Sequence, residues 1–188
     1  MLTFFRKKNS PVQVAAEGLY AALIAQSRQP AFYTVWGVPD TVDGRFDSVL
    51  MHCFIVMHRL GHGDKDSRAL SQALYDTMFV EMDRAVREMG VGDLSVKRHV
   101  RRMMKAFNGR VAAYEAGLAD NALLHDALRR NLYGTVPDVA QEALNRVGAY
   151  LLTSLERVMG MDMNELVAGR IVWADLPETP VELRKAAS

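Results

Sequence analysis

The chain has 188 residues, of which 49% are hydrophobic and 24% charged, so we expect a packed globular domain and exclude a disordered chain. Its 23 Lys and Arg residues are balanced by 22 Asp and Glu residues, so the overall charge favours no class of partner. Its only cysteine, Cys53, excludes an intramolecular disulfide. The longest nearly apolar run covers only residues 49–57, whereas a bilayer span needs about 20 residues, so we expect a soluble protein.

The first ten residues read MLTFFRKKNS and place apolar side chains before basic ones, which is the reverse of a secretory signal peptide. We predict a flexible N-terminus over residues 1–10, a helical domain over 11–170 and a C-terminal tail over 171–188. Contact of the N-terminus with an anionic membrane surface is the alternative, because Leu2, Phe4 and Phe5 precede three basic residues.

The first predicted helix begins at Pro11 and ends near Arg28, with Val14, Leu19 and Leu23 in its apolar stripe. Residues 31–42 are expected to be extended or turn-like. Asp43 is then expected to cap a helix that ends near Leu60. The apolar residues of this second helix follow the i, i+3, i+4 pattern without a gap, so we expect it to be the central and most buried helix. They are Phe46, Val49, Leu50, Cys53, Phe54, Met57 and Leu60.

Helix-start and helix-stop signals continue along the rest of the chain, and no strand-like alternation interrupts them. The dipeptide Asn108-Gly109 is expected to kink or break a helix. Asp120 is a predicted N-cap, and Pro137 is expected to open a long helix. The predicted segments are residues 67–89, 94–107, 110–119, 120–133, 137–159 and 162–168. The sequence therefore predicts an all-α fold, a single helical bundle of about six to eight helices.

The segment KRHVRRMMK at residues 97–105 has five basic side chains and no acidic one. On a helix they would share one face, because residues three and four positions apart are neighbours. Such a face can neutralise phosphates of RNA or of a membrane surface, and the alternative is an ordinary solvated helix face. The candidate basic partner face consists of Lys97, Arg98, Arg101, Arg102 and Lys105.

Two histidine pairs raise the question of a metal site. His58 and His62 have the i, i+4 spacing of helical metal ligands, but Gly61 is predicted to break the helix between them. His125-Asp126 is typical of HD-type metal-dependent hydrolases, which also need an upstream histidine and a distant aspartate.

The candidates for these two further ligands are His99 and Asp162, but their spacing from His125-Asp126 is not specific for such a site. Cys53 lies in the most apolar helix, where a thiolate is costly, so we expect it to be structural. We therefore predict no catalytic residue, no metal and no cofactor, which favours a binding protein over an enzyme.

Three stretches occur in linked order: WGVPDTVDGRFD at 36–47, LYDTMFVEMDRAVREMGVGDLSV at 74–96 and FNGRVAAYEAGL at 107–118. Together they resemble the ubiquinol-cytochrome c chaperone family, and the similarity covers residues 30–160. The resemblance implies a non-enzymatic, all-helical chaperone that binds newly made cytochrome b and supports assembly of the cytochrome bc1 complex. It also implies a second assembly factor and the ribosome as partners, because mitochondrial members act with a second factor near the ribosome exit.

The sequence departs from the family pattern at Asn108, where an aromatic residue usually precedes the Gly-Arg at 109–110. It also lacks the long N-terminal extension of the mitochondrial members. The missing extension fits a bacterial cytoplasmic protein. We also expect peripheral contact with the inner face of the inner membrane.

The resemblance suggests roles for two groups of residues. Trp36 and Phe46 are expected to pack over the core, while Asp40, Asp43 and Arg45 hold the start of the central helix. Arg45, Asp83, Arg87 and Asp93 become candidates for a polar network that holds or borders the client surface. A purely structural role is the alternative, since Asp83 and Arg87 form an ordinary i, i+4 pair.

Overall fold

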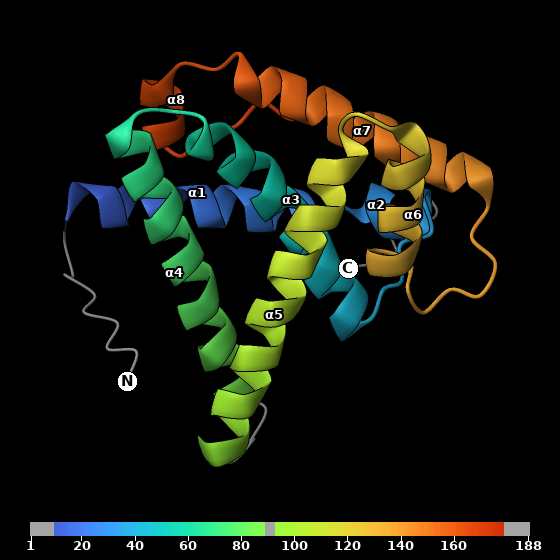
Figure 1. The fold of residues 1–188 in the computed structure, drawn as a ribbon, viewed down its shortest axis with the longest axis horizontal. Helices are drawn as coiled ribbons and strands as arrows, with labels where there is room; N and C mark the ends of the chain where they lie inside the picture. Colours follow the sequence, from blue (N-terminus) through green and yellow to red (C-terminus); the bar gives the residue numbers. More distant parts are fainter. Residues whose placement is uncertain (1–9, 89–92, 179–188) are drawn as a thin grey trace.

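The computed structural model describes residues 10–88 and 93–178. In this part of the chain there are eight helices and no strand, which confirms the all-α prediction (Figure 1). The helices are α1 (Pro11–Ser27), α2 (Pro30–Thr34), α3 (Val42–Gly61), α4 (Lys65–Glu88), α5 (Asp93–Gly117), α6 (Asn121–Asn131), α7 (Gln141–Met159) and α8 (Met163–Val167). Helices α4 and α5 diverge as a V, whose tip points away from α7 (Figure 1).

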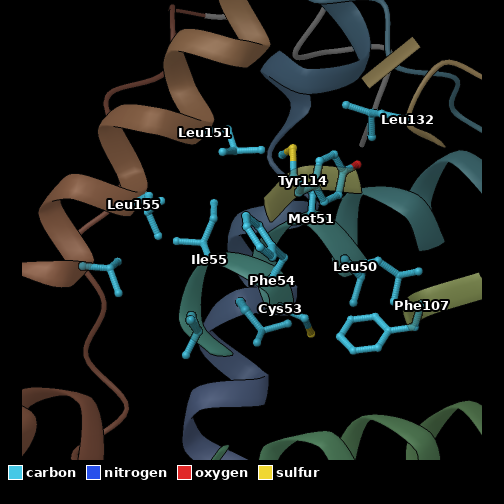
Figure 2. Close-up of a cluster of buried hydrophobic side chains, with 14 of the residues drawn as sticks. Leu50, Met51, Cys53, Phe54, Ile55, Phe107, Tyr114, Leu132, Leu151 and Leu155 are labelled. Carbon is cyan, nitrogen blue, oxygen red and sulfur yellow. The ribbon is translucent and has the colours of Figure 1, made fainter. Parts of the chain in front are cut away.

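Helix α3 is the central helix, as predicted, and contacts α1, α4, α5 and α7. Every residue from 49 to 56 is buried. Figure 2 shows that different faces of α3 serve different neighbours: Ile55 faces Leu151 and Leu155 of α7, and Leu50 faces Phe107 of α5. The predicted apolar pattern therefore continues around the helix because α3 is covered on several sides.

Two predictions at the start of α3 are wrong. Thr41, rather than Asp43, is the N-cap, because its hydroxyl accepts a hydrogen bond from the Gly44 N–H at 3.1 Å. Asp43 lies in the first turn instead, where a carboxylate favours the positive end of the helix dipole. The preceding segment is not wholly extended either, since Pro30 occupies the first position of the short helix α2.

Two further helix boundaries and the burial of one residue differ from the predictions. Helix α5 runs without a break through Asn108 and Gly109, which are exposed and cost the helix only about 1 kcal/mol in propensity. Helix α7 begins at Gln141 rather than Pro137, because the Val136 N–H donates to the carbonyl of Tyr133 and holds a turn there. In α1 the predicted stripe residue Val14 is 61% exposed, whereas Leu19 and Leu23 are buried as expected.

A chain of buried hydrogen bonds connects α1, α7 and α3. The Gln26 Nε2 donates to the Tyr150 hydroxyl at 2.9 Å. The same hydroxyl oxygen lies 2.9 Å from Nε2 of His52. The His52 Nδ1 lies 2.7 Å from the carbonyl oxygen of Ser48. A carbonyl can only accept, so Nδ1 carries the proton and Nε2 accepts from Tyr150. Complete burial of this neutral ring lowers the pKa of His52 to about 4.

The loop before α3 packs onto this chain of hydrogen bonds. The Trp36 ring lies edge-on to Phe32 at 5.2 Å and tilted against Tyr150 at 5.5 Å, and its carbonyl accepts from the Tyr133 hydroxyl. Trp36 is buried and the half-buried Phe46 also packs against the core, as predicted. The loop therefore has a fixed position from which α3 starts.

The described part of the predicted tail, residues 171–178, lies along α7. The Trp173 ring contacts the His52 ring at 5.0 Å, and the Ala174 N–H donates to the Ser154 hydroxyl at 3.0 Å. Arg157 donates to the Trp173 carbonyl at 2.6 Å. This segment therefore covers the buried histidine.

Candidate functional site

A half-open groove of about 610 Å³ lies between four helices. Its lining comes from the start of α3, the last turns of α4, the middle of α5, and the end of α6 with the turn that follows. Its walls are mostly apolar and include Val42, Phe46, Met82, Val86, Met103 and Leu132. A groove of this size and composition suits an apolar ligand held by a few polar contacts.

An ion pair joins two helices in this groove. The Arg110 Nη2 of α5 lies 2.6 Å from Oδ1 of Asp47 on α3, and only 19% and 12% of the two side chains are exposed. Burial raises the pKa of Asp47 to about 6, and the neighbouring guanidinium opposes this rise. The pair therefore connects the first and the third of the family-like stretches, 36–47 and 107–118.

Three polar side-chain atoms at this pair are buried without a hydrogen-bond partner in the described part of the chain: Oδ1 of Asp47, which contacts Arg110 only as an ion pair, Nε of Arg110 and the Tyr114 hydroxyl. Burial and the nearby Asp47 charge raise the pKa of Tyr114, and Arg110 opposes them. In Figure 2 the Tyr114 hydroxyl points toward Leu132, which lines the groove. We call Asp47, Arg110 and Tyr114 the polar floor.

Asp83 and Arg87 do not line the groove, but each directly follows a residue that does, Met82 and Val86. The Arg87 Nε lies 2.6 Å from Oδ2 of Asp83, and both side chains are more than a third exposed. Asp93 is the first residue of α5, and its side chain lies outside the described residues.

The Arg45 Nε instead lies 2.5 Å from Oδ1 of Asp40, and its guanidinium stands 5.4 Å from the centre of the Tyr33 ring. This contact joins the loop before α3 to the first turn of the helix, and the role of Asp40, Asp43 and Arg45 in holding the start of α3 stays a prediction. A network that joins Arg45 to Asp83, Arg87 and Asp93 stays a prediction.

The predicted basic face lies on α5. Arg98, Arg101, Arg102 and Lys105 are exposed, and the side chain of Lys97 lies outside the described residues. Arg102 also lines the groove. Use of this face by the ribosome, by RNA or by a second assembly factor stays a prediction.

Three of the nominated metal ligands have other partners, and the side chain of His99 lies outside the described residues. Asp126 pairs with Arg129 at 2.7 Å, Asp162 caps α8, and His125 lies 2.9 Å from the Gln141 amide. As predicted, the helix ends between His58 and His62, because Gly61 is the last residue of α3 and His62 is its C-cap. In residues 10–88 and 93–178, no group of three or more His, Cys, Asp or Glu side chains is placed to hold a metal ion.

The hydropathy of the helices bears on membrane contact. No helix in the part of the chain that the structure describes is both long enough and apolar enough to cross a bilayer.

Cys53 is fully buried in α3, and burial raises the pKa of its thiol, as expected for a structural cysteine.

The sequence analysis missed the polar floor. Asp47 and Arg110 are separated by 63 positions, so their spacing gives no sign that they meet. One signal was available: each is a charged residue on an otherwise apolar helix face, Asp47 three residues before Leu50, and Arg110 three residues after Phe107. Charged residues at such positions are rarely buried without a partner.

Residues 34–173 match the family model described as Ubiquinol-cytochrome C chaperone. The chain belongs to the ubiquinol-cytochrome c chaperone family. The match includes all three family-like stretches and the whole polar floor, so the predicted family is confirmed.

Relatives in animals carry an assembly-factor name. Ubiquinol-cytochrome-c reductase complex assembly factor 1 of Xenopus laevis is 21% identical over 169 residues, which cover 89% of this chain and 84% of that protein. The proteins of Mus musculus and Homo sapiens with the same name are also 21% identical, and this chain spans 57% and 56% of their lengths.

A solved structure shares the fold. The crystal structure of the Cbp3 homolog from Brucella abortus matches with a TM-score of 0.78 and 32% identity, over 91% of this chain and 94% of that one. These comparisons give no support to the RNA-binding or hydrolase alternatives.

Proposed function

We propose that this member of the ubiquinol-cytochrome c chaperone family is a non-enzymatic assembly chaperone of the cytochrome bc1 complex, ubiquinol-cytochrome c reductase, and that it binds newly made cytochrome b. The family match and the assembly-factor names of the relatives support the chaperone role. The half-open, mostly apolar groove above the polar floor is the observation that supports client binding. We place the protein in the cytoplasm, with peripheral contact at the inner face of the membrane.

The groove suits a client that is a membrane protein. An unassembled membrane segment exposes apolar side chains, and shielding them requires apolar walls that remain accessible. Met82 and Met103 line the groove, and methionine side chains adapt to differently shaped apolar partners. Val42 lines the groove and is 74% exposed, so the groove presents an apolar side chain that a client can reach.

Val42→Asp tests whether the groove binds the client. We expect this variant to keep wild-type stability, because Val42 is exposed and an acidic residue is favourable in the first turn of a helix. Capture of nascent cytochrome b should fall by about tenfold or more, since a charge would have to be buried against an apolar client. The measurement is a pull-down with the tagged chaperone during cytochrome b synthesis.

Val14→Asp is the matched control. Val14 is also in the first turns of a helix and 61% exposed, but it does not line the groove. Equal capture by the two variants would show that the client binds elsewhere.

The Asp83–Arg87 pair, next in sequence to the groove residues Met82 and Val86, gives a second test. Asp83→Ala and Arg87→Ala should each change the free energy of unfolding by only about 0–1 kcal/mol, because both side chains are substantially exposed. Both variants should nevertheless capture nascent cytochrome b poorly and lower the amount of assembled bc1 complex. Loss of the folded state in thermal melts, or normal capture by both variants, would contradict a client-binding role.

A further inference from the structure

The basic face of α5 carries positive charge that the described fold does not compensate. Arg98, Arg101 and Lys105 are exposed, and none of them is paired with a carboxylate in the part of the chain that the structure describes. Elsewhere seven arginines each form an ion pair with a carboxylate: Arg45, Arg84, Arg87, Arg129, Arg146, Arg157 and Arg170. A cluster of uncompensated cations attracts an anionic partner.

The basic face adjoins the groove along α5. A helix turns by about 100° per residue, so the described members of the basic face fall within one arc of about 100°. The groove-lining residues of α5 fall within the next arc: Arg102, Met103, Ala106 and Arg110. Arg102 belongs to both sets, because it is exposed and also lines the groove. An anionic surface that contacts the basic face would therefore lie beside the half-open groove.

We propose that the basic face binds the anionic phospholipid surface of a membrane and holds the groove beside the bilayer. The inference rests on the proposed function, because a chaperone of cytochrome b has to receive apolar segments that belong in a bilayer. Lipid phosphates attract cations near the surface, and each Lys or Arg strengthens such binding by about fivefold.

Nucleic acid is the rival partner for a basic helix face. Proteins that bind single strands usually stack bases on aromatic side chains that lie among the basic ones. No Phe, Trp or Tyr occurs between residues 97 and 105. The composition of the face therefore favours lipid headgroups, which need charge but no stacking surface.

Vesicle flotation tests the docking surface on the full-length protein. One set of vesicles contains phosphatidylcholine alone, and the other contains about 30% phosphatidylglycerol as the anionic lipid. The wild-type protein should float with the anionic vesicles and stay unbound with the neutral ones. Raising the salt concentration from about 0.05 M to about 0.5 M should release it, because salt screens interactions between exposed charges.

The triple variant Arg98→Gln/Arg101→Gln/Lys105→Gln removes the uncompensated charge. Its melting temperature should match that of the wild type, since all three side chains are exposed and glutamine has a similar helix propensity. Its affinity for the anionic vesicles should fall by about a hundredfold, because three cations are lost. If the triple variant is unstable, Arg101→Gln and Lys105→Gln alone should each lose about fivefold.

The matched control is Arg28→Gln/Lys65→Gln/Arg68→Gln. It removes the same charge from three exposed positions that lie outside α5 and do not line the groove. This control should bind the anionic vesicles almost as tightly as the wild type, because net charge alone does not create the docking surface.

Three results would overturn the inference. One is equal flotation of the wild-type protein with neutral and anionic vesicles. Another is unchanged binding by the basic-face variants, which would place the contact elsewhere, for example in residues 1–10. The third is displacement of the vesicles by ribosomal RNA together with loss of RNA affinity in the same variants, which would assign the face to nucleic acid.

Capture of nascent cytochrome b by the wild-type protein is scored separately in detergent, without vesicles. If capture persists while any of these three results is obtained, the inference fails alone. If the protein binds anionic vesicles through the basic face but captures no cytochrome b, the proposed function fails instead.

Discussion

Arg110→Ala is expected to lower the free energy of unfolding by about 3–5 kcal/mol, because it leaves the Asp47 carboxylate buried without its partner. The raised pKa of Asp47 shows that burial already opposes its charge even beside the guanidinium. Urea unfolding at pH 7 measures the loss. A protein at the lower end of the usual range of stability, about 5 kcal/mol, would be only marginally folded after this change.

Two further variants distinguish the effect of breaking the buried ion pair from the effect of removing any arginine charge. Arg45→Ala removes an exposed arginine from its pair with Asp40 and should cost only about 0–1 kcal/mol. The double variant Asp47→Leu/Arg110→Met replaces both partners by apolar side chains of similar size and should recover most of the loss. If Arg110→Ala is as stable as Arg45→Ala, the ion pair does not hold α3 to α5.

The second large effect is expected in acid and comes from His52. Its pKa is about 4 in the folded protein and 6.5 in the unfolded chain, so the unfolded state binds more protons between these values. The stabilisation is therefore present above pH 6.5 and is lost as the pH falls toward 4. Between pH 7 and pH 4.5 this loss amounts to roughly 2–3 kcal/mol.

Asp47 acts in the opposite direction. Its folded-state pKa of about 6 lies above the ordinary value of 3.8, so its contribution is present below pH 3.8 and is lost as the pH rises through 6. The two effects partly cancel in the wild-type protein. Urea unfolding at pH 4.5 and pH 7 should therefore be compared between the wild type and His52→Gln.

The acid-induced loss of stability should be smaller in His52→Gln by roughly 2–3 kcal/mol. Asp47→Asn provides the comparison of opposite sign, because it should make the acid-induced loss larger. An identical pH dependence of wild type and His52→Gln would show that the buried ring does not titrate as its surroundings indicate.

Hydrophobic periodicity was sufficient to predict the helices but not all of their ends. The pattern from Phe46 to Leu60 identifies α3 and its central position, because burial on several sides leaves few polar positions. Thr41 and Asp43 are both good N-caps two residues apart, and local sequence does not decide between them. At Asn108-Gly109, the buried residues Phe107 and Tyr114 on either side keep the helix continuous despite a poor local propensity.

The candidate site was less predictable than the fold because it depends on which helices meet. Periodicity shows that one face of α5 is buried, but not that Arg110 on this face meets the first turns of α3. The i, i+4 rule correctly paired Asp83 with Arg87, since both are on one helix. It carries no information about the Asp47–Arg110 contact, which requires the crossing of two helices.

The position of the two tryptophans determines what optical spectroscopy can report on this protein. Trp36 lies tilted against Tyr150, Trp173 contacts His52, and neither tryptophan lines the groove. Intrinsic fluorescence therefore follows the hydrogen-bonded core around His52, where protonation of the imidazole would quench the neighbouring indole. Occupation of the groove places no client group against either indole, so binding needs a label on the client, and the native emission remains an independent signal for the integrity of the fold.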